Sequence, residues 1–262
     1  MPDARHAGPI ASARRLRLLA GHTLGEALRM RLALLTGVAA VLLLLAARWL
    51  REFNFGMAEL PMLGEFGLGA MGLLGTVLAA LATAHLIFSD FAGGAAACVL
   101  TRPVRRWEYV AGKYAGIAAL LALFTVALGA MLAGLLAWRS NQLGVPPAAW
   151  PILLSACALQ WMKFTLVAAM TLVVCTYAST ALFASVAGLM LAVIGHLRSI
   201  TTGGMLDWLR VWPNLGLFDA EALLSSGQPL AGAALFALIG YWATCLALLV
   251  GLSSHVFKHR EF

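Results

Sequence analysis

The stretch Tyr114–Trp138 reads YAGIAALLALFTVALGAMLAGLLAW and contains no charged side chain. A helix crosses the hydrocarbon core of a bilayer with about 20 predominantly apolar residues, so this stretch is long enough to span it. It lacks the alternation of apolar and polar residues that marks a β-barrel strand. A spanning helix also satisfies every backbone polar group internally, as lipid requires. We therefore predict a transmembrane helix here.

Five other stretches share this apolar character: Leu32–Leu50, Phe66–Phe88, Ile152–Tyr177, Ala181–Leu197 and Leu230–Leu252. The chain of 262 residues is 62% hydrophobic and 11% charged, whereas soluble domains are about 45–50% apolar and about 25% charged. No internal repeat or low-complexity linker divides it. The sequence therefore predicts an all-α integral membrane protein, with six transmembrane helices in a single domain over residues 1–262.

The lysine and arginine residues predict the orientation of these helices. With six spans, residues 1–31, the loop 89–113 and the C-terminal tail share one side of the membrane and carry 12 of the 18 cations, against 5 on the other side. Because cytoplasmic loops are enriched in Lys and Arg, we place both termini in the cytoplasm and the chain in the cell inner (plasma) membrane. The same placement explains the net charge of +7 without a nucleic-acid partner.

Two segments outside the spans have amphipathic character. In residues 12–31, apolar positions such as Leu16, Leu19 and Ala20 recur at steps of three and four among arginines. This pattern predicts an interfacial helix in the cytoplasmic headgroup layer, although a basic flank that only sets topology is an alternative. The outer loop 199–229 is rich in Trp, which prefers the headgroup depth, so we expect interfacial or re-entrant helices there.

The loop 89–113 is expected to carry a short amphipathic helix. Pro103 suits a first helical position, and Val104, Trp107 and Tyr114 then fall at helical spacing. A basic helix with a Trp between two spans is suited to docking into a groove on a soluble partner. Alternatively, its cations only enforce the cytoplasmic orientation.

A family resemblance supports the docking interpretation. The run Leu100–Tyr109 (LTRPVRRWEY), followed by Gly112–Gly116 (GKYAG), resembles the loop after the second span of ABC-2-type permeases. Thr23–Arg29 is similar to their N-terminal helix, and Trp212-Pro213-Asn214 with Phe218-Asp219 is similar to their last outer loop. The closest group is the one linked with multicopper-enzyme maturation. The uncharged run Ala92–Ala97 departs from the family pattern.

The resemblance implies a half-transporter, usually an exporter. A second permease chain, identical or different, and two ATP-hydrolysing subunits would complete it, with ATP and Mg²⁺ bound by the partner ATPase and no cofactor in this chain. The loop would act as the coupling helix. The residues expected to bind the partner are Arg102, Pro103, Val104, Arg105, Arg106, Trp107, Glu108 and Lys113.

The chain itself lacks the sequence features of an ATPase. A phosphate-binding loop needs GxxxxGK followed by Ser or Thr, but Gly112-Lys113 is followed by Tyr114, and the motif occurs nowhere else. We therefore predict that the chain is not an enzyme. Glycines at four-residue steps, such as Gly112 and Gly116, favour close helix packing or a dimer seam.

Lys163 and His85 are the candidate residues of a transport path, because both fall inside predicted spans. An ammonium in the membrane should face protein, water or a carboxylate. Lys163 could attract an anionic substrate, or it could snorkel or bond to carbonyl groups. His85 could relay protons or simply pack through a hydrogen bond. The acidic residues of the outer loops are expected to be solvated charges: Glu52, Glu59, Glu65, Asp207, Asp219 and Glu221.

Two other classes of function stay open. A membrane enzyme or assembly factor would use Glu65, His85 or Lys163 at a site of its own, but no nucleophile or metal motif accompanies these residues. A self-contained secondary transporter would carry more polar residues or broken helices within its spans. The four cysteines show neither a disulfide framework nor a metal-binding spacing.

Overall fold

The computed structural model describes residues 9–46, 59–92, 106–144, 150–197, 212–220 and 232–256. Every regular element in these ranges is helical, which confirms the predicted all-α class. The elements are α1 (Pro9–Arg29), α2 (Arg31–Ala46), α3 (Glu59–Ala92), α5 (Arg106–Leu143), α6 (Trp150–Tyr177), α7 (Ala181–Leu197), the 3₁₀ helix η5 (Leu215–Phe218) and α9 (Gly232–Val256).

Four of the described helices, α3, α5, α6 and α9, are long and apolar enough to cross a membrane. The other two predicted spans correspond to α2, with 16 residues, and α7, with 17. At 1.5 Å per residue α7 is about 26 Å long, slightly less than the hydrocarbon core of about 30 Å. The predicted first span continues to Leu50, outside the described residues. The chain is thus a multi-pass membrane protein, and the count of six spans stays a prediction.

The boundaries of α3 and α5 differ from those predicted. Both helices extend well beyond their apolar stretches, and α5 runs without a break from Arg106 into its span. Residues 106–113 are therefore the first turns of a spanning helix and not part of a separate short helix between two spans. Local sequence signals mark two of the helix boundaries. Gly144 adopts φ +65° directly after the end of α5, and the Thr180 hydroxyl accepts a hydrogen bond from the Phe183 N–H at the start of α7.

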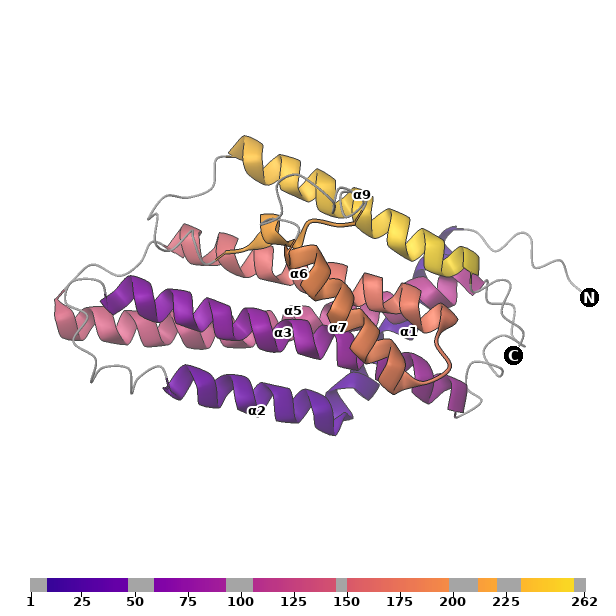
Figure 1. Cartoon of the computed structure of the whole chain (residues 1–262), viewed down its shortest axis with the longest axis horizontal. Coiled ribbons are helices and arrows are strands. Elements are labelled where there is room, and N and C mark those ends of the chain that lie inside the picture. The colour runs from indigo at the N-terminus through magenta and orange to yellow at the C-terminus, as the bar shows by residue number, and fades with distance from the viewer. Residues whose placement is uncertain are drawn as a thin grey trace, which may run out of the picture.

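Helix α6 lies at the centre of the bundle. It packs against α3, α5, α7 and α9. In its most apolar stretch of 18 residues, 67% of the residues are buried, whereas none is buried in the corresponding stretch of α9. Figure 1 shows α3, α5 and α6 side by side, with α2 and α9 at opposite edges and α7 crossing obliquely. Helix α1 and the Val256 end of α9 lie at the same end of this bundle. We call this the α1 end.

Glycines set the closest helix contacts of the bundle. A Cβ atom at Gly75 of α3 would overlap the ring of Phe164, a fully buried residue of α6. A Cβ atom at Gly134 of α5 would meet no heavy atom within 4 Å. These two glycines therefore predict opposite responses to the same substitution.

We expect Gly75→Ala to lower the free energy of unfolding by about 1–3 kcal/mol, because the aromatic ring must shift and the two helices must separate. Gly134→Ala should leave stability unchanged or raise it slightly, because alanine is the better helix former. Thermal unfolding of both variants in one detergent compares them directly. Equal melting temperatures would contradict the packing of α3 on α6.

Candidate functional site

A buried lysine holds three helices together at the α1 end. The ammonium of Lys113 in α5 lies 3.2 Å from Oε2 of Glu26 in α1 and 2.9 Å from Oδ2 of Asp90 in α3. It also donates a hydrogen bond of 3.1 Å to the backbone carbonyl of Leu86. Lys113 is 3% exposed, and its three N–H donors match these three acceptors. The burial of its charge is therefore compensated.

Two hydroxyl groups complete the arrangement. The Tyr109 hydroxyl donates to the Asp90 carboxylate, and the Ser89 hydroxyl donates to Oε1 of Glu26 at 2.8 Å. We call Glu26, Ser89, Asp90, Tyr109 and Lys113 the Lys113 cluster. Since two carboxylates share one ammonium, the hydroxyl donors stabilise the excess negative charge. Removing any charged member would leave another buried charge without its full set of partners.

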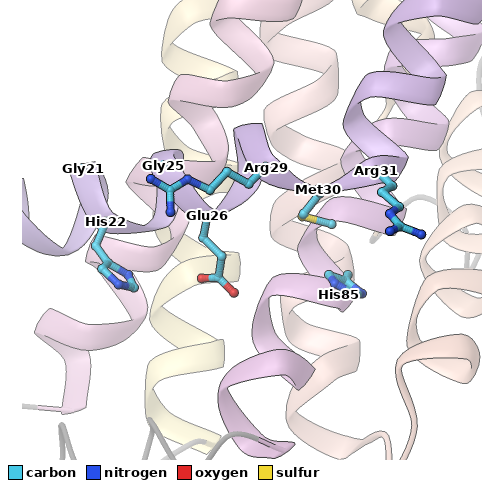
Figure 2. A pocket seen from close by; sticks show the side chains of 8 residues that line it. All are labelled: Gly21, His22, Gly25, Glu26, Arg29, Met30, Arg31 and His85. Carbon is cyan, nitrogen blue, oxygen red and sulfur yellow. The ribbon is translucent and has the colours of Figure 1, made fainter.

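The sequence brings α1 close enough for these contacts by placing two glycines on α5. A Cβ atom at Gly112 would lie 2.7 Å from the Leu19 Cβ, and one at Gly116 would lie 2.8 Å from the Ala20 carbonyl oxygen. Helix α1 therefore rests directly on the α5 backbone, and it runs crosswise to the upright helices (Figure 2). In the motif Gly112–Gly116 the glycines make room for α1, and the lysine binds it.

A second ion pair joins the same two helices. Arg15 of α1 lies 3.6 Å from Oε2 of Glu108 in α5, and the Glu108 side chain is 1% exposed. Glu108 and Lys113 were both predicted to contact a partner protein. The structure instead turns them toward α1, so we no longer include them in the docking surface.

The other predicted docking residues lie at or before the start of α5. Arg102, Pro103, Val104 and Arg105 are outside the described residues. Arg106 is the first residue of α5, although its side chain is outside the described set. Trp107 is 41% exposed. Among the predicted docking side chains that the structure describes, Trp107 is therefore the accessible one.

An open groove of about 700 Å³ lies beside the Lys113 cluster. His85 of α3 is exposed and lies in this groove near Met30 and Arg31 (Figure 2). Lys163 lines a different cavity, between α3, α6 and α7. The structure therefore does not bring His85 and Lys163 together. The residues that line the groove are Gly21, His22, Gly25, Glu26, Arg29, Met30, Arg31 and His85.

Lys163 pairs with an acidic residue of the segment between α7 and α9. Its ammonium lies 2.6 Å from Oδ1 of Asp219, and Nε2 of His196 in α7 lies 3.6 Å from Oδ2 of the same carboxylate. The expectation that Asp219 is a solvated loop charge was therefore wrong. Lys163 is 8% exposed, and such a buried ammonium needs a counterion. The sequence indicated this need but not which acidic residue would meet it.

The segment Trp212–Ala220 is the described part of the predicted outer loop 199–229, and it folds onto the bundle. The Asn214 N–H donates to the Tyr241 hydroxyl oxygen of α9 at 2.8 Å, while the Asn214 side chain caps η5. Phe218 is fully buried and stacks on Tyr241, with 6.3 Å between the ring centroids. These contacts hold Asp219 in place beside α6 and α7. The remainder of the predicted interfacial loop lies outside the described residues.

The described ranges contain no group of three or more His, Cys, Asp or Glu side chains that could hold a metal ion. Both sites act through ion pairs and hydrogen bonds, which can break and form again with other partners. The Lys113 cluster connects helices, whereas Lys163 presents a buried cation next to a cavity.

We expect Lys113→Met to lower the free energy of unfolding by about 3–5 kcal/mol, because the buried Asp90 and the half-buried Glu26 would lose their cation. Adding Asp90→Asn should recover part of this loss by removing one of the two carboxylate charges. Arg139→Met provides a matched control, since Arg139 lies near the other end of α5 and makes a solvent-exposed hydrogen bond to Gln142; it should change stability by roughly 0.5 kcal/mol or less. Chemical unfolding in detergent measures all three, and equal losses in Lys113→Met and Arg139→Met would contradict the cluster's role.

Comparison with known proteins assigns the chain to a family. A search of curated proteins finds no match. The family model described as ABC-2 family transporter protein matches residues 19–205, more than half of the chain. This match includes the Lys113 cluster and Lys163, and it agrees with the apolar spanning helices. The chain therefore belongs to the ABC-2 family of transporter proteins.

Proposed function

We propose that this chain is the membrane-spanning permease subunit of an ATP-driven exporter whose ATPase is a separate chain. The observation that carries the proposal is the position of the Lys113 cluster relative to the loop between α3 and α5. Ser89 and Asp90 precede this loop, and Tyr109 and Lys113 follow it. Both flanks of the loop are thus connected to each other and to α1.

This arrangement allows a force on the loop to move three helices together. A partner that displaced residues 93–105 would move the adjoining ends of α3 and α5, and α1 would follow because Glu26 is bonded to both Ser89 and Lys113. Separating these helices would break the ion pairs and leave buried charges without partners, which costs free energy. ATP would drive the motion only if the partner binds the loop differently in its nucleotide states.

The proposed docking surface is the predicted coupling segment 102–107. It carries four cationic or aromatic side chains, Arg102, Arg105, Arg106 and Trp107, next to Pro103 and Val104. Tryptophan and arginine supply much of the binding energy in protein interfaces. Trp107 is exposed on the first turn of α5, directly before the cluster. ATP and Mg²⁺ would be bound by the ATPase, since this chain has no phosphate-binding loop.

In the membrane we propose six spans with α1 in the cytoplasmic headgroup layer. The crosswise direction of α1 supports this placement (Figure 2), as does the exposure of both arginines and leucines along it, such as Arg17, Leu18 and Leu28. A second permease chain would complete the transporter and provide the path between the two copies. The alternative of a membrane enzyme loses support because His85 and Lys163 line separate cavities.

We expect Trp107→Ala and Arg106→Glu to uncouple ATP hydrolysis from transport without unfolding the chain. The first removes an exposed anchor, and the second reverses a charge at the proposed contact. Substrate-dependent ATP hydrolysis should fall by about ten-fold, as for the loss of a single interface anchor. It is measured in proteoliposomes that contain the permease with its co-purified ATPase.

Trp138→Ala is the matched control, because Trp138 lies on the same helix and is 40% exposed, against 41% for Trp107. It should retain normal coupling, and all three variants should melt at similar temperatures. Normal coupling in both docking variants would remove the docking role. Failure to recover any ATPase with the native chain would contradict the proposed function itself.

A further inference from the structure

The carboxylate of Asp219 occupies a position defined by two other helices. One of its oxygens faces the Lys163 ammonium of α6, and the other faces the His196 imidazole of α7. The distances are 2.6 Å and 3.6 Å. Lys163 and His196 therefore form a binding site for an anion, which they approach from two helices. We call this site the seat. In this structure the chain's own Asp219 fills the seat.

The seat faces an open cavity of about 460 Å³ between α3, α6 and α7. Lys163 and His196 both line this cavity, whereas Asp219 is not among its lining residues. The remaining wall is largely apolar and includes Leu73 and Val77 of α3 and Leu189 and Val193 of α7. Its volume lies within the usual range of about 300–1,000 Å³ for small-molecule sites. The cavity thus combines a basic end with hydrocarbon walls.

These two properties select one class of ligand. Once Asp219 has left the seat, a cation would be repelled by Lys163, and a small water-soluble anion would leave the apolar walls without a partner. We propose that Lys163 and His196 bind an anionic amphiphile, whose carboxylate or phosphate replaces the Asp219 carboxylate while its hydrocarbon chain fills the cavity. The anion can come from a free fatty acid or from a lipid headgroup, because both present the same chemistry to the seat.

In this proposal Asp219 acts as a competitor built into the chain. The segment Trp212–Ala220 holds it in the seat through Asn214 and Phe218, which both contact Tyr241. Binding of the amphiphile would require Asp219 to move away from Lys163. If the chain is part of an exporter, as proposed above, the amphiphile is its substrate class. Only the transport step rests on that proposed function. The binding step concerns this chain without its ATPase.

The test measures the binding of radiolabelled oleate to the purified full chain in nanodiscs of phosphatidylcholine. The native chain should bind oleate about ten-fold more tightly than uncharged oleyl alcohol, as expected for one charged hydrogen bond. Asp219→Asn should tighten oleate binding several-fold by removing the competing carboxylate. Lys163→Gln combined with Asp219→Asn keeps a neutral pair in the seat and should abolish the preference for oleate.

A second pair of variants tests the cavity and does not alter the ion pair. Val193→Trp should fill the cavity and weaken the binding of both ligands about ten-fold. Val186→Trp is its control, since Val186 lies two turns earlier on α7, has similar exposure (49% against 51%) and does not line the cavity. It should bind as the native chain does. Equal binding by Val193→Trp and Val186→Trp would overturn the proposal.

Competition identifies the source of the anion. Displacement of labelled oleate by phosphatidylglycerol would uphold the site and point to a lipid headgroup, whereas displacement by unlabelled oleate alone would uphold it and point to a free acid. Absence of any preference for oleate over oleyl alcohol, in both the native chain and Asp219→Asn, would overturn it. Since no ATPase is present, such a failure is distinct from a failure of the coupling variants.

Discussion

A single buried ammonium determines how the α1 end of this protein is built. Lys113 is accommodated in an apolar helix because Glu26, Asp90 and the Leu86 carbonyl accept its three hydrogens. Each of these partners comes from α1 or α3, so the lysine fixes both helices against α5. Its charge would be too costly to bury without them. The close approach of α1 over Gly112 and Gly116 makes these contacts possible.

The two ion-pair sites are related through α6, which packs against α3, α5, α7 and α9. At one site Lys113 connects helices on both flanks of the α3–α5 loop. At the other, Lys163 of α6 holds the segment Trp212–Ala220 through Asp219. In both, a lysine on a spanning helix captures a carboxylate from another element. We infer that the first connects the chain to its ATPase and the second to its cargo.

The apolar stretches predicted the helices well, because hydropathy depends on local sequence. The ion pairs could not be predicted in the same way, since Lys113 and Glu26 are 87 residues apart and Lys163 and Asp219 are 56 apart. The sequence shows that a buried lysine needs a carboxylate, but the packing of the helices decides which one. For the same reason Glu108 and Lys113 were predicted to face a partner: a charged residue beside a loop suggests solvent, and the covering helix α1 begins far away in the chain.

We infer that α1 and α5 move as one unit through Lys113. Pulsed electron paramagnetic resonance tests it with spin labels at Arg17 and Ala115, two exposed positions on these helices, after replacement of the native cysteines. In the assembled transporter, the distance distribution between these labels should be the same without nucleotide and in the vanadate-trapped state. With Lys113→Met it should broaden and depend on the nucleotide state. A shift of this distance in the native chain, or native behaviour of Lys113→Met, would contradict the account.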